Sequence, residues 1–177
     1  MQKEITSLEL ADEIPVSAFV RVELENRTCN DLPNYLTKIC PDVMDKKRAP
    51  QKGLPLVLVF ASDAMKVIQI CKSLNTLPKS VRIAEVFAKH KDIEEHVKML
   101  ESFPFHVVVG TPHRIKSLVE RGCLKLTALQ FIVVDMAKNV KNFTVLDLPD
   151  TKIEFFRFYV KYLHQIIKQN QTKLVLF

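Results

Sequence analysis

The sequence predicts an α/β fold built on a single, mostly parallel β-sheet with helices on both faces. Short apolar runs rich in valine and isoleucine alternate with amphipathic stretches of ten or more residues. This alternation is typical of β-α-β units, in which each helix packs back on the sheet. The chain has 177 residues, of which 47% are hydrophobic and 26% charged, enough for one large core. We therefore expect residues 1–177 to form one domain.

Six segments have the composition of strands. Leu56–Phe60 and Val107–Val109 are continuous apolar runs, which fit central parallel strands that are covered on both faces. The full set of expected strands is Ala18–Val22, Leu56–Phe60, Val81–Phe87, Val107–Val109, Phe131–Val134 and Lys173–Phe177.

Capping residues mark the expected helices. Asp31 stands where it can cap a helix that closes before Pro41, and Ser62 or Asp63 can cap the helix after the strand at 56–60. Both alternatives for the second cap are open.

Two later helices show capping-box spacing. Asp92 and Glu95 fit the start of one helix, and Thr151 and Glu154 fit the start of a long helix that runs to about Lys168. The stretch between the strand at 131–134 and this last helix is expected to be mostly irregular.

The chain is organised around the strand-to-helix joint that follows Val107–Val109. Gly110 ends the strand, and Thr111 can cap the next helix with its side-chain oxygen. Pro112 suits the first helical position, and Gly122 stands where a helix ends in the left-handed conformation. A helix start of this kind can bind an anion such as phosphate, although an ordinary joint would look the same.

Polar and basic residues gather where the expected strands end. These groups are Ala61–Asp63, Ala88–His90, Gly110–Arg114 and Asp135–Lys138, and three of the four contain a basic residue. Because the carboxyl ends of parallel strands meet at one edge, where ligands bind in such sheets, we expect a binding surface there.

Charge and composition narrow the function classes. The net charge of +6 favours phosphate-rich partners. No apolar run is long enough to cross a bilayer, and the polar N-terminal stretch has no signal-peptide core, so we expect an intracellular protein without membrane contact.

The four cysteines lack zinc spacing, which predicts reduced thiols and no metal. No heptad seam suggests an obligate dimer, so we expect a monomer.

The phosphate-binding motifs of nucleotide-dependent enzymes are missing. The sequence has neither G-x-x-x-x-G-K-[ST] nor G-x-G-x-x-G, and its three glycines lie in different loops. Asp135 could hold Mg²⁺, but its neighbours offer no second carboxylate. We therefore expect no catalytic residues, no cofactor and no metal.

The strand-end groups, taken together, resemble the first RecA-like domain of DEAD-box RNA helicases. Val109–Ile115 resembles the T-P-G-R motif that grips the RNA backbone, with His113 in place of glycine. Phe60–Asp63 stands where these helicases have P-T-R-E, Phe87–His90 where they have a Gly-Gly pair, and Val134–Lys138 at D-E-A-D. The resemblance implies a RecA-like three-layer sandwich.

Departures from the helicase pattern imply that the domain is not an enzyme. Glu23–Asn30 stands in the region of the phosphate loop, and Met136 replaces the glutamate that activates water. We also find no second RecA-like domain with its arginine finger, and ATP hydrolysis needs these parts together.

A closer resemblance is to the Cms-type ribosomal small-subunit proteins, a family of nucleolar factors of early small-subunit pre-ribosomes. It rests on four stretches in order: Tyr35–Pro41, Val86–His90, Val109–Lys116 and Lys173–Phe177. The resemblance implies a pseudo-helicase of the small-subunit processome in the nucleus and nucleolus, with pre-ribosomal RNA or assembly proteins as partners.

The leading hypothesis is a non-catalytic RNA-binding factor in small-subunit ribosome biogenesis. Arg114 and Lys89 would pair with phosphates, while hydroxyl groups would add donors to a single-stranded or A-form backbone. The candidate RNA-binding residues are Ser62, Lys89, His90, Thr111, His113 and Arg114. A protein-interaction scaffold without RNA contact, or a working ATP-dependent RNA helicase, are the alternatives.

Overall fold

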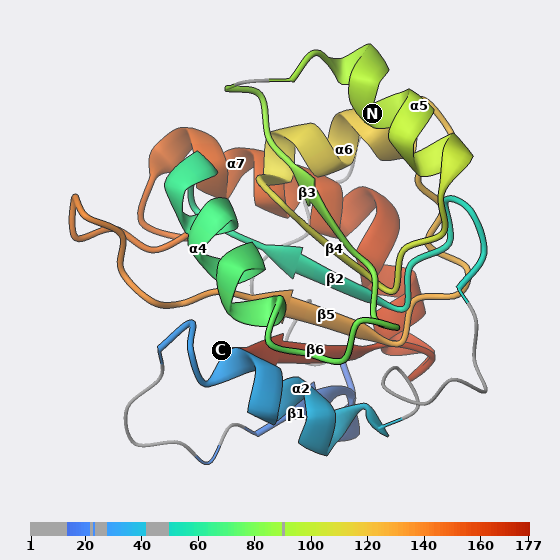
Figure 1. Ribbon diagram of the computed structural model, residues 1–177. Helices are drawn as coiled ribbons and strands as arrows, with labels where there is room; N and C mark the ends of the chain where they lie inside the picture. The colour runs from blue at the N-terminus through green and yellow to red at the C-terminus, as the bar shows by residue number, and fades with distance from the viewer. Residues whose placement is uncertain (1–13, 22, 24–27, 42–49, 90) are drawn as a thin grey trace, which may run out of the picture.

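The computed structural model describes residues 14–21, 23, 28–41, 50–89 and 91–177 of the protein. These residues form three layers, with a six-stranded sheet between two layers of helices (Figure 1). The predicted α/β class and the three-layer arrangement are confirmed.

The sheet is parallel throughout its six strands. They are β1 (Phe19–Val20), β2 (Val57–Phe60), β3 (Ile83–Val86), β4 (Val107–Gly110), β5 (Phe131–Val134) and β6 (Lys173–Leu176). Their order across the sheet is β1-β6-β5-β2-β4-β3, and each neighbouring pair is parallel. Each strand coincides with a predicted apolar run, although β1 has only two residues and Val22 lies outside the described residues. All the carboxyl ends therefore meet at one edge of the sheet.

The helices divide between the two faces of the sheet. Two helices, α2 (Leu32–Ile39) and α4 (Ala64–Leu74), cover one face. The other face is covered by α5 (Ile93–Ser102), α6 (Pro112–Glu120), α7 (Pro149–Phe158) and α8 (His164–Lys168). A short 3₁₀ turn, η1 (Val16–Ala18), precedes β1.

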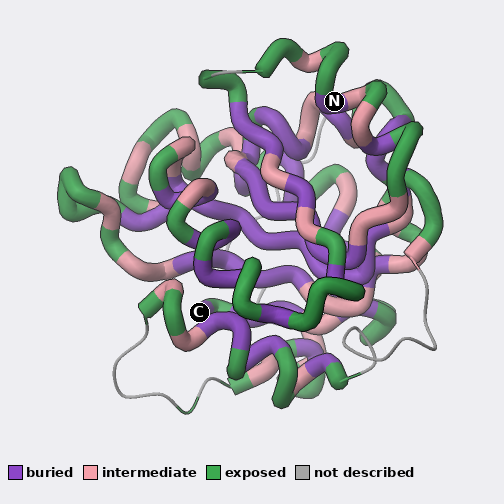
Figure 2. Tube along the Cα trace, in the orientation of Figure 1, coloured by how far each residue is buried: buried purple, intermediate pink, exposed green. Residues whose placement is uncertain are grey.

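The core lies on both sides of the central strands, as Figure 2 shows by burial. Alternate residues of β2 point to opposite faces: Leu58 and Phe60 pack under α6 and α7, and Val57 and Val59 pack under α2 and α4. All four side chains are fully buried. Burial of each such side chain stabilises the fold by about 1.5–3 kcal/mol, which explains why β2 is apolar on both faces.

Two predicted helix caps are formed, with partners that the structure now defines. Asp63, rather than Ser62, caps α4, since its carboxylate accepts the backbone N–H of Lys66 at 3.0 Å. Asp92 caps α5, but it accepts the N–H of Ile93 rather than completing a capping box with Glu95.

Three predicted caps lack the expected side-chain hydrogen bond, although Asp31 and Thr111 hold the N-cap positions of α2 and α6. Asp31 holds the cap position of α2, but its carboxylate accepts two hydrogen bonds from Thr28 instead. Thr111 precedes α6 without a side-chain cap bond. Helix α7 begins at Pro149, which suits the first helical position, so Thr151 lies inside the first turn and forms no capping box.

The long C-terminal helix reaches Lys168 as predicted, but it is not uniform. Between α7 and α8 the backbone forms one π-helical segment, η2 (Tyr159–Leu163). A π segment takes one extra residue into a turn and so shifts the register of the buried side chains. Gly122 has φ +76°, which confirms the predicted left-handed end of α6, and residues 139–148 are irregular as expected.

Candidate functional site

The carboxyl edge of the sheet brings the predicted strand-end groups together. Backbone hydrogen bonds continue past the strands, since Ala61 N–H donates to the carbonyl of Gly110 at 3.0 Å and Asp135 N–H donates to that of Phe60 at 2.9 Å. The segments after β2, β4 and β5 therefore lie side by side.

Asp63 is the centre of a hydrogen-bond network at this edge. Its carboxylate accepts from the Ser62 hydroxyl at 3.1 Å, the Lys66 backbone at 3.0 Å and the Asn139 amide at 2.7 Å. Burial would raise the pKa of Asp63, but the N–H of Lys66 and the Asn139 amide outweigh it and lower that pKa below its ordinary value. The network ties the irregular segment after β5 to the start of α4.

A buried ion pair occupies the end of β5. Lys66 Nζ lies 3.2 Å from an oxygen of Asp135, and the two side chains are only 8% and 4% exposed. The second oxygen of Asp135 accepts the N–H of Ala137 at 3.2 Å. Burial raises the pKa of Asp135 and Lys66 limits the rise. The Asp135 carboxylate is therefore already paired with a cation of the protein itself, the Lys66 ammonium.

Two of the predicted RNA-binding residues lie inside the protein. Ser62 and Arg114 are 5% and 8% exposed. Arg114 points under α5, where its Nη1 lies 3.4 Å from Nδ1 of buried His96. Sequence reasoning placed both side chains on a solvent-facing edge, and neither is offered to an external phosphate in this structure.

The remaining predicted residues lie at or near the surface. Lys89 is exposed and Thr111 is half-buried, and the side chain of His113 is 74% exposed. Val86 of β3 and Gly110 of β4 lie side by side in the sheet. Lys89 follows Val86 by three residues and His113 follows Gly110 by three, so both come just after the carboxyl ends of neighbouring strands. His90 lies outside the described residues.

Sequence reasoning missed a charged cluster between α6 and α7. Glu154, interpreted there as a capping-box residue, accepts a hydrogen bond from Lys116 Nζ at 2.9 Å and another from Arg157 Nη1 at 3.1 Å. His113 Nδ1 lies 3.9 Å from the same carboxylate. The spacing of Thr151 and Glu154 was the available signal in the sequence. It was ambiguous, because the same glutamate can complete a capping box or pair with cations of a neighbouring helix.

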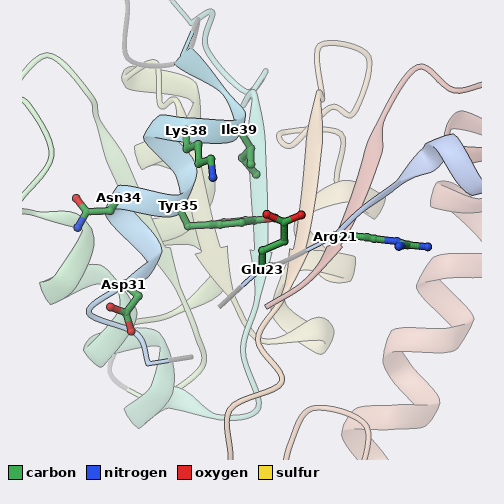
Figure 3. Close-up of a pocket in the computed structure, with 7 residues that line it drawn as sticks. All are labelled: Arg21, Glu23, Asp31, Asn34, Tyr35, Lys38 and Ile39. Carbon is green, nitrogen blue, oxygen red and sulfur yellow. The ribbon is translucent and has the colours of Figure 1, made fainter. Parts of the chain in front are cut away.

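A hollow of about 260 Å³ lies beside the carboxyl end of β1 (Figure 3). Tyr35 reaches from α2 toward Glu23, while Arg21 points away from both. The lining residues are Arg21, Glu23, Asp31, Asn34, Tyr35, Lys38 and Ile39. Two cations are thus balanced by two carboxylates, which gives the hollow no net positive charge for a phosphate.

Donors beside this hollow are already used within the chain. The backbone N–H and the hydroxyl of Thr28 both donate to Asp31, at 3.0 and 2.7 Å. These bonds lower the pKa of Asp31 below its ordinary value, so the carboxylate stays ionised. Thr28 belongs to the segment Glu23–Asn30, which was expected to replace a phosphate loop.

Neither a cluster of metal ligands nor a membrane-spanning helix occurs in the described part of the chain. Residues 14–21, 23, 28–41, 50–89 and 91–177 contain no group of three or more His, Cys, Asp or Glu side chains that could hold a metal ion. Within the same ranges, no helix has both the length and the hydrophobicity that crossing a bilayer requires.

Comparison with known proteins gives one family and a set of relatives. The sequence model of the family described as "CMS1: U3-containing 90S pre-ribosomal complex subunit" matches residues 1–177. The chain is 32% identical to Protein CMSS1 of Homo sapiens over 166 residues, which cover 93% of this chain and 58% of that protein. It is 31% identical to Protein CMSS1 of Xenopus laevis over 145 residues, covering 80% and 51%. The chain thus spans between about half and three-fifths of these relatives.

Solved structures with the same fold include DEAD-box proteins. A DEAD box protein from Methanococcus jannaschii aligns with a TM-score of 0.54 and 19% identity, covering 96% of this chain and 40% of that one. At this identity the similarity shows the fold alone. It confirms the RecA-like fold that the motif resemblance predicted.

Proposed function

Since this chain belongs to the CMS1 family of U3-containing 90S pre-ribosomal complex subunits, we propose that it is a non-catalytic RNA-binding factor in small-subunit ribosome assembly. It acts in the nucleus and nucleolus, in contact with pre-ribosomal RNA and assembly proteins, and needs no cofactor. The observation that carries the RNA part is the pairing of β3 with β4. This pairing sets Lys89 and His113 at one corner of the sheet.

The absence of catalysis is inferred from the Lys66–Asp135 ion pair. ATP-driven phosphoryl transfer needs carboxylates that hold Mg²⁺ and a cradle of donors for the phosphates. Asp135 already faces a buried ammonium 3.2 Å away, which would repel a divalent cation. Near β1, the donors of Thr28 are taken by Asp31. The chain's own charges thus oppose both the metal and the nucleotide.

RNA contact is inferred from charge and exposure. Lys89 and His113 are exposed and follow β3 and β4, which the sheet holds in place, so their positions are fixed while their side chains stay accessible. The net charge of +6 favours a polyanion. Exposed basic side chains of this kind contact the phosphate backbone rather than base edges, so we expect little dependence on RNA sequence.

The test is a salt titration of binding to a fluorescein-labelled, single-stranded oligouridylate, followed by anisotropy. The double variant Lys89→Glu/His113→Glu should bind more weakly than wild type. Its plot of log K against log salt should be shallower by about 0.7 per lost phosphate contact. The control is Lys79→Glu/Lys125→Glu, which changes two exposed lysines before β3 and β5, at the opposite edge.

The control removes more positive charge than the test variant, so a loss confined to the test variant cannot arise from net charge. If the two double variants bound the RNA with equal affinity, Lys89 and His113 would not belong to the RNA-binding surface. Absence of binding by the wild-type protein would overturn the RNA-binding function itself.

A second candidate function, a protein scaffold, is favoured by an apolar stripe on α7 and η2. Ile153, Phe156 and Val160 are 47%, 40% and 41% exposed and are spaced as one helical face. In this case, Phe156→Ser should reduce co-sedimentation with pre-ribosomal particles, while the Lys89→Glu/His113→Glu variant should sediment like wild type. The opposite pattern would favour RNA contact.

A further inference from the structure

Four ionisable side chains converge where α6 packs against α7. Glu154 Oε2 lies 2.9 Å from Lys116 Nζ and 3.9 Å from His113 Nδ1, and Glu154 Oε1 lies 3.1 Å from Arg157 Nη1. We call His113, Lys116, Glu154 and Arg157 the Glu154 cluster. Among the described residues, Glu154 is the one carboxylate within ion-pair distance of these three side chains.

The cluster holds more positive than negative charge. The hydrogen bond from Lys116, helped by Arg157, lowers the pKa of Glu154 below its ordinary value, so the carboxylate is ionised at neutral pH. The two positive charges of Lys116 and Arg157 exceed this single negative charge by one. The side chains of His113 and Arg157 are 74% and 67% exposed and face solvent, while those of Lys116 and Glu154, at 24% and 20%, lie deeper.

The arrangement of donors suits a tetrahedral oxyanion as well as a carboxylate. Lys116 and Arg157 approach different oxygens of Glu154 from two helices, and charge-assisted donors of this kind bind phosphate in the same way. His113 also follows β4 at the sheet corner that carries Lys89, so this residue belongs to both parts of the proposed surface.

We propose that the Glu154 cluster is a site for an RNA backbone phosphate, and that Glu154 occupies the anion position in the free protein. On binding, a phosphate takes the place of the carboxylate beside Lys116, Arg157 and His113. This inference rests on the proposed RNA-binding function and extends its surface from the sheet corner onto α6 and α7. Glu154 thereby weakens RNA binding, because its ion pairs must be given up first.

A neighbouring ion pair separates this role from simple helix packing. Glu120 on α6 pairs at 3.3 Å with Lys161 of η2, the segment that continues α7. That carboxylate has one cation, whereas Glu154 has three partners. Glu120→Gln and Glu154→Gln therefore each remove one negative charge from the contact between α6 and the C-terminal helical segments, but only the second leaves more than one cation without its carboxylate.

The experiment compares these two variants with wild type in the oligouridylate anisotropy assay at fixed ionic strength. Glu154→Gln should tighten binding by about fivefold, the effect of losing roughly 1 kcal/mol of competing exposed ion pairs. Glu120→Gln should change affinity much less. Adding Lys116→Gln and Arg157→Gln to Glu154→Gln should abolish the gain.

The outcomes separate this inference from the function on which it rests. If wild type binds and the two glutamine variants bind equally well, the Glu154 cluster is only a link between helices, and the RNA-binding function stands. If neither wild type nor Glu154→Gln binds, the RNA-binding function fails and this site fails with it. A urea unfolding curve for Glu154→Gln checks that the variant is folded.

Discussion

Arg114 Nη1 lies 3.4 Å from Nδ1 of His96, and both side chains are buried between α5 and α6. A guanidinium can only donate hydrogen bonds, so Nδ1 of His96 must be the unprotonated nitrogen. Burial, and then the charge of Arg114, lower the pKa of His96 below its ordinary value. The pair joins the start of α6 to α5 only while the imidazole is neutral.

Stability should therefore fall in mild acid. The pKa of buried His106 is also lowered, by burial and by Arg82, and its Nδ1 accepts the N–H of Arg82 at 3.0 Å. Below pH ~6.5 the unfolded chain binds protons that the folded chain resists, so stability present above that pH is lost as pH falls through the folded pKa values. Urea unfolding between pH 8 and pH 5 measures the slope.

The variant His96→Gln should flatten this dependence. The unfolding free energy of this variant at each pH is compared with its own value at pH 8, because any loss of packing caused by the substitution is the same at every pH. A His96→Gln protein whose unfolding free energy falls with acid as steeply as that of wild type would show that the Arg114–His96 contact does not contribute to the pH dependence.

The Lys66–Asp135 pair should show strong coupling. Lys66→Met leaves a buried carboxylate without its counter-charge and should cost about 3–5 kcal/mol of unfolding free energy. The double variant Lys66→Met/Asp135→Asn should recover much of that loss, because no isolated charge remains. Chemical denaturation of the four proteins of the cycle measures the coupling.

Lys72→Met is the matched control for this cycle, because Lys72 is an exposed lysine in the last turn of the same helix. It should change the unfolding free energy by less than about 0.5 kcal/mol. Strictly additive losses in the cycle would mean that the two charges do not stabilise one another.

Gly110 should not tolerate alanine. A Cβ at Gly110 would collide with Cγ2 of Val86 and would lie 2.6 Å from the Val86 carbonyl oxygen. Gly110→Ala should cost about 1–3 kcal/mol or more by overpacking. Adding Val86→Ala should not restore stability, since the carbonyl remains in place.

Gly122→Ala provides the comparison, because its φ is +76° but no atom lies within 4 Å of the added carbon. Its cost should be that of left-handed backbone alone, about 1–2 kcal/mol. Thermal unfolding of both variants measures the difference. Full rescue of Gly110→Ala by Val86→Ala would contradict the close approach of β3 and β4.

Tyr159→Phe should not destabilise the protein. The Tyr159 hydroxyl is buried and has no hydrogen-bond partner among the described residues, and burial raises the pKa of Tyr159 to about 12. Removing a buried, unsatisfied hydroxyl relieves a desolvation cost, so the unfolding free energy should stay level or rise by about 1 kcal/mol. If urea unfolding instead showed that Tyr159→Phe lowers the unfolding free energy by more than about 1 kcal/mol, the Tyr159 hydroxyl would have a stabilising hydrogen bond in the folded protein.

The sequence predicted the elements better than the contacts between them. Strands such as Val107–Val109 follow from local apolar runs, and their parallel order follows from the helices between them. Arg114 was predicted at the surface because it belongs to a strand-end group and to the stretch that resembles T-P-G-R, but Arg114 and Leu118 lie one helical turn apart on the buried face. That spacing was the available signal for its burial.

Other contacts join residues that are far apart in the chain. Lys66 shares the buried face of α4 with Ile70 and Leu74, which indicates a buried cation, but nothing local identifies Asp135 as its partner. Glu154 and Lys116 meet only because α6 and α7 pack together. Such pairs depend on tertiary geometry, which residue patterns along the chain do not contain.

The buried pair of Lys66 and Asp135 also constrains how this lineage can evolve. Either single substitution leaves a buried charge unmatched, so drift at one position is selected against until the other changes. The two codons should therefore covary among descendants of this gene. A change that freed Asp135 to hold a metal ion would first have to replace Lys66, and so would pass through a protein with an unpaired buried carboxylate.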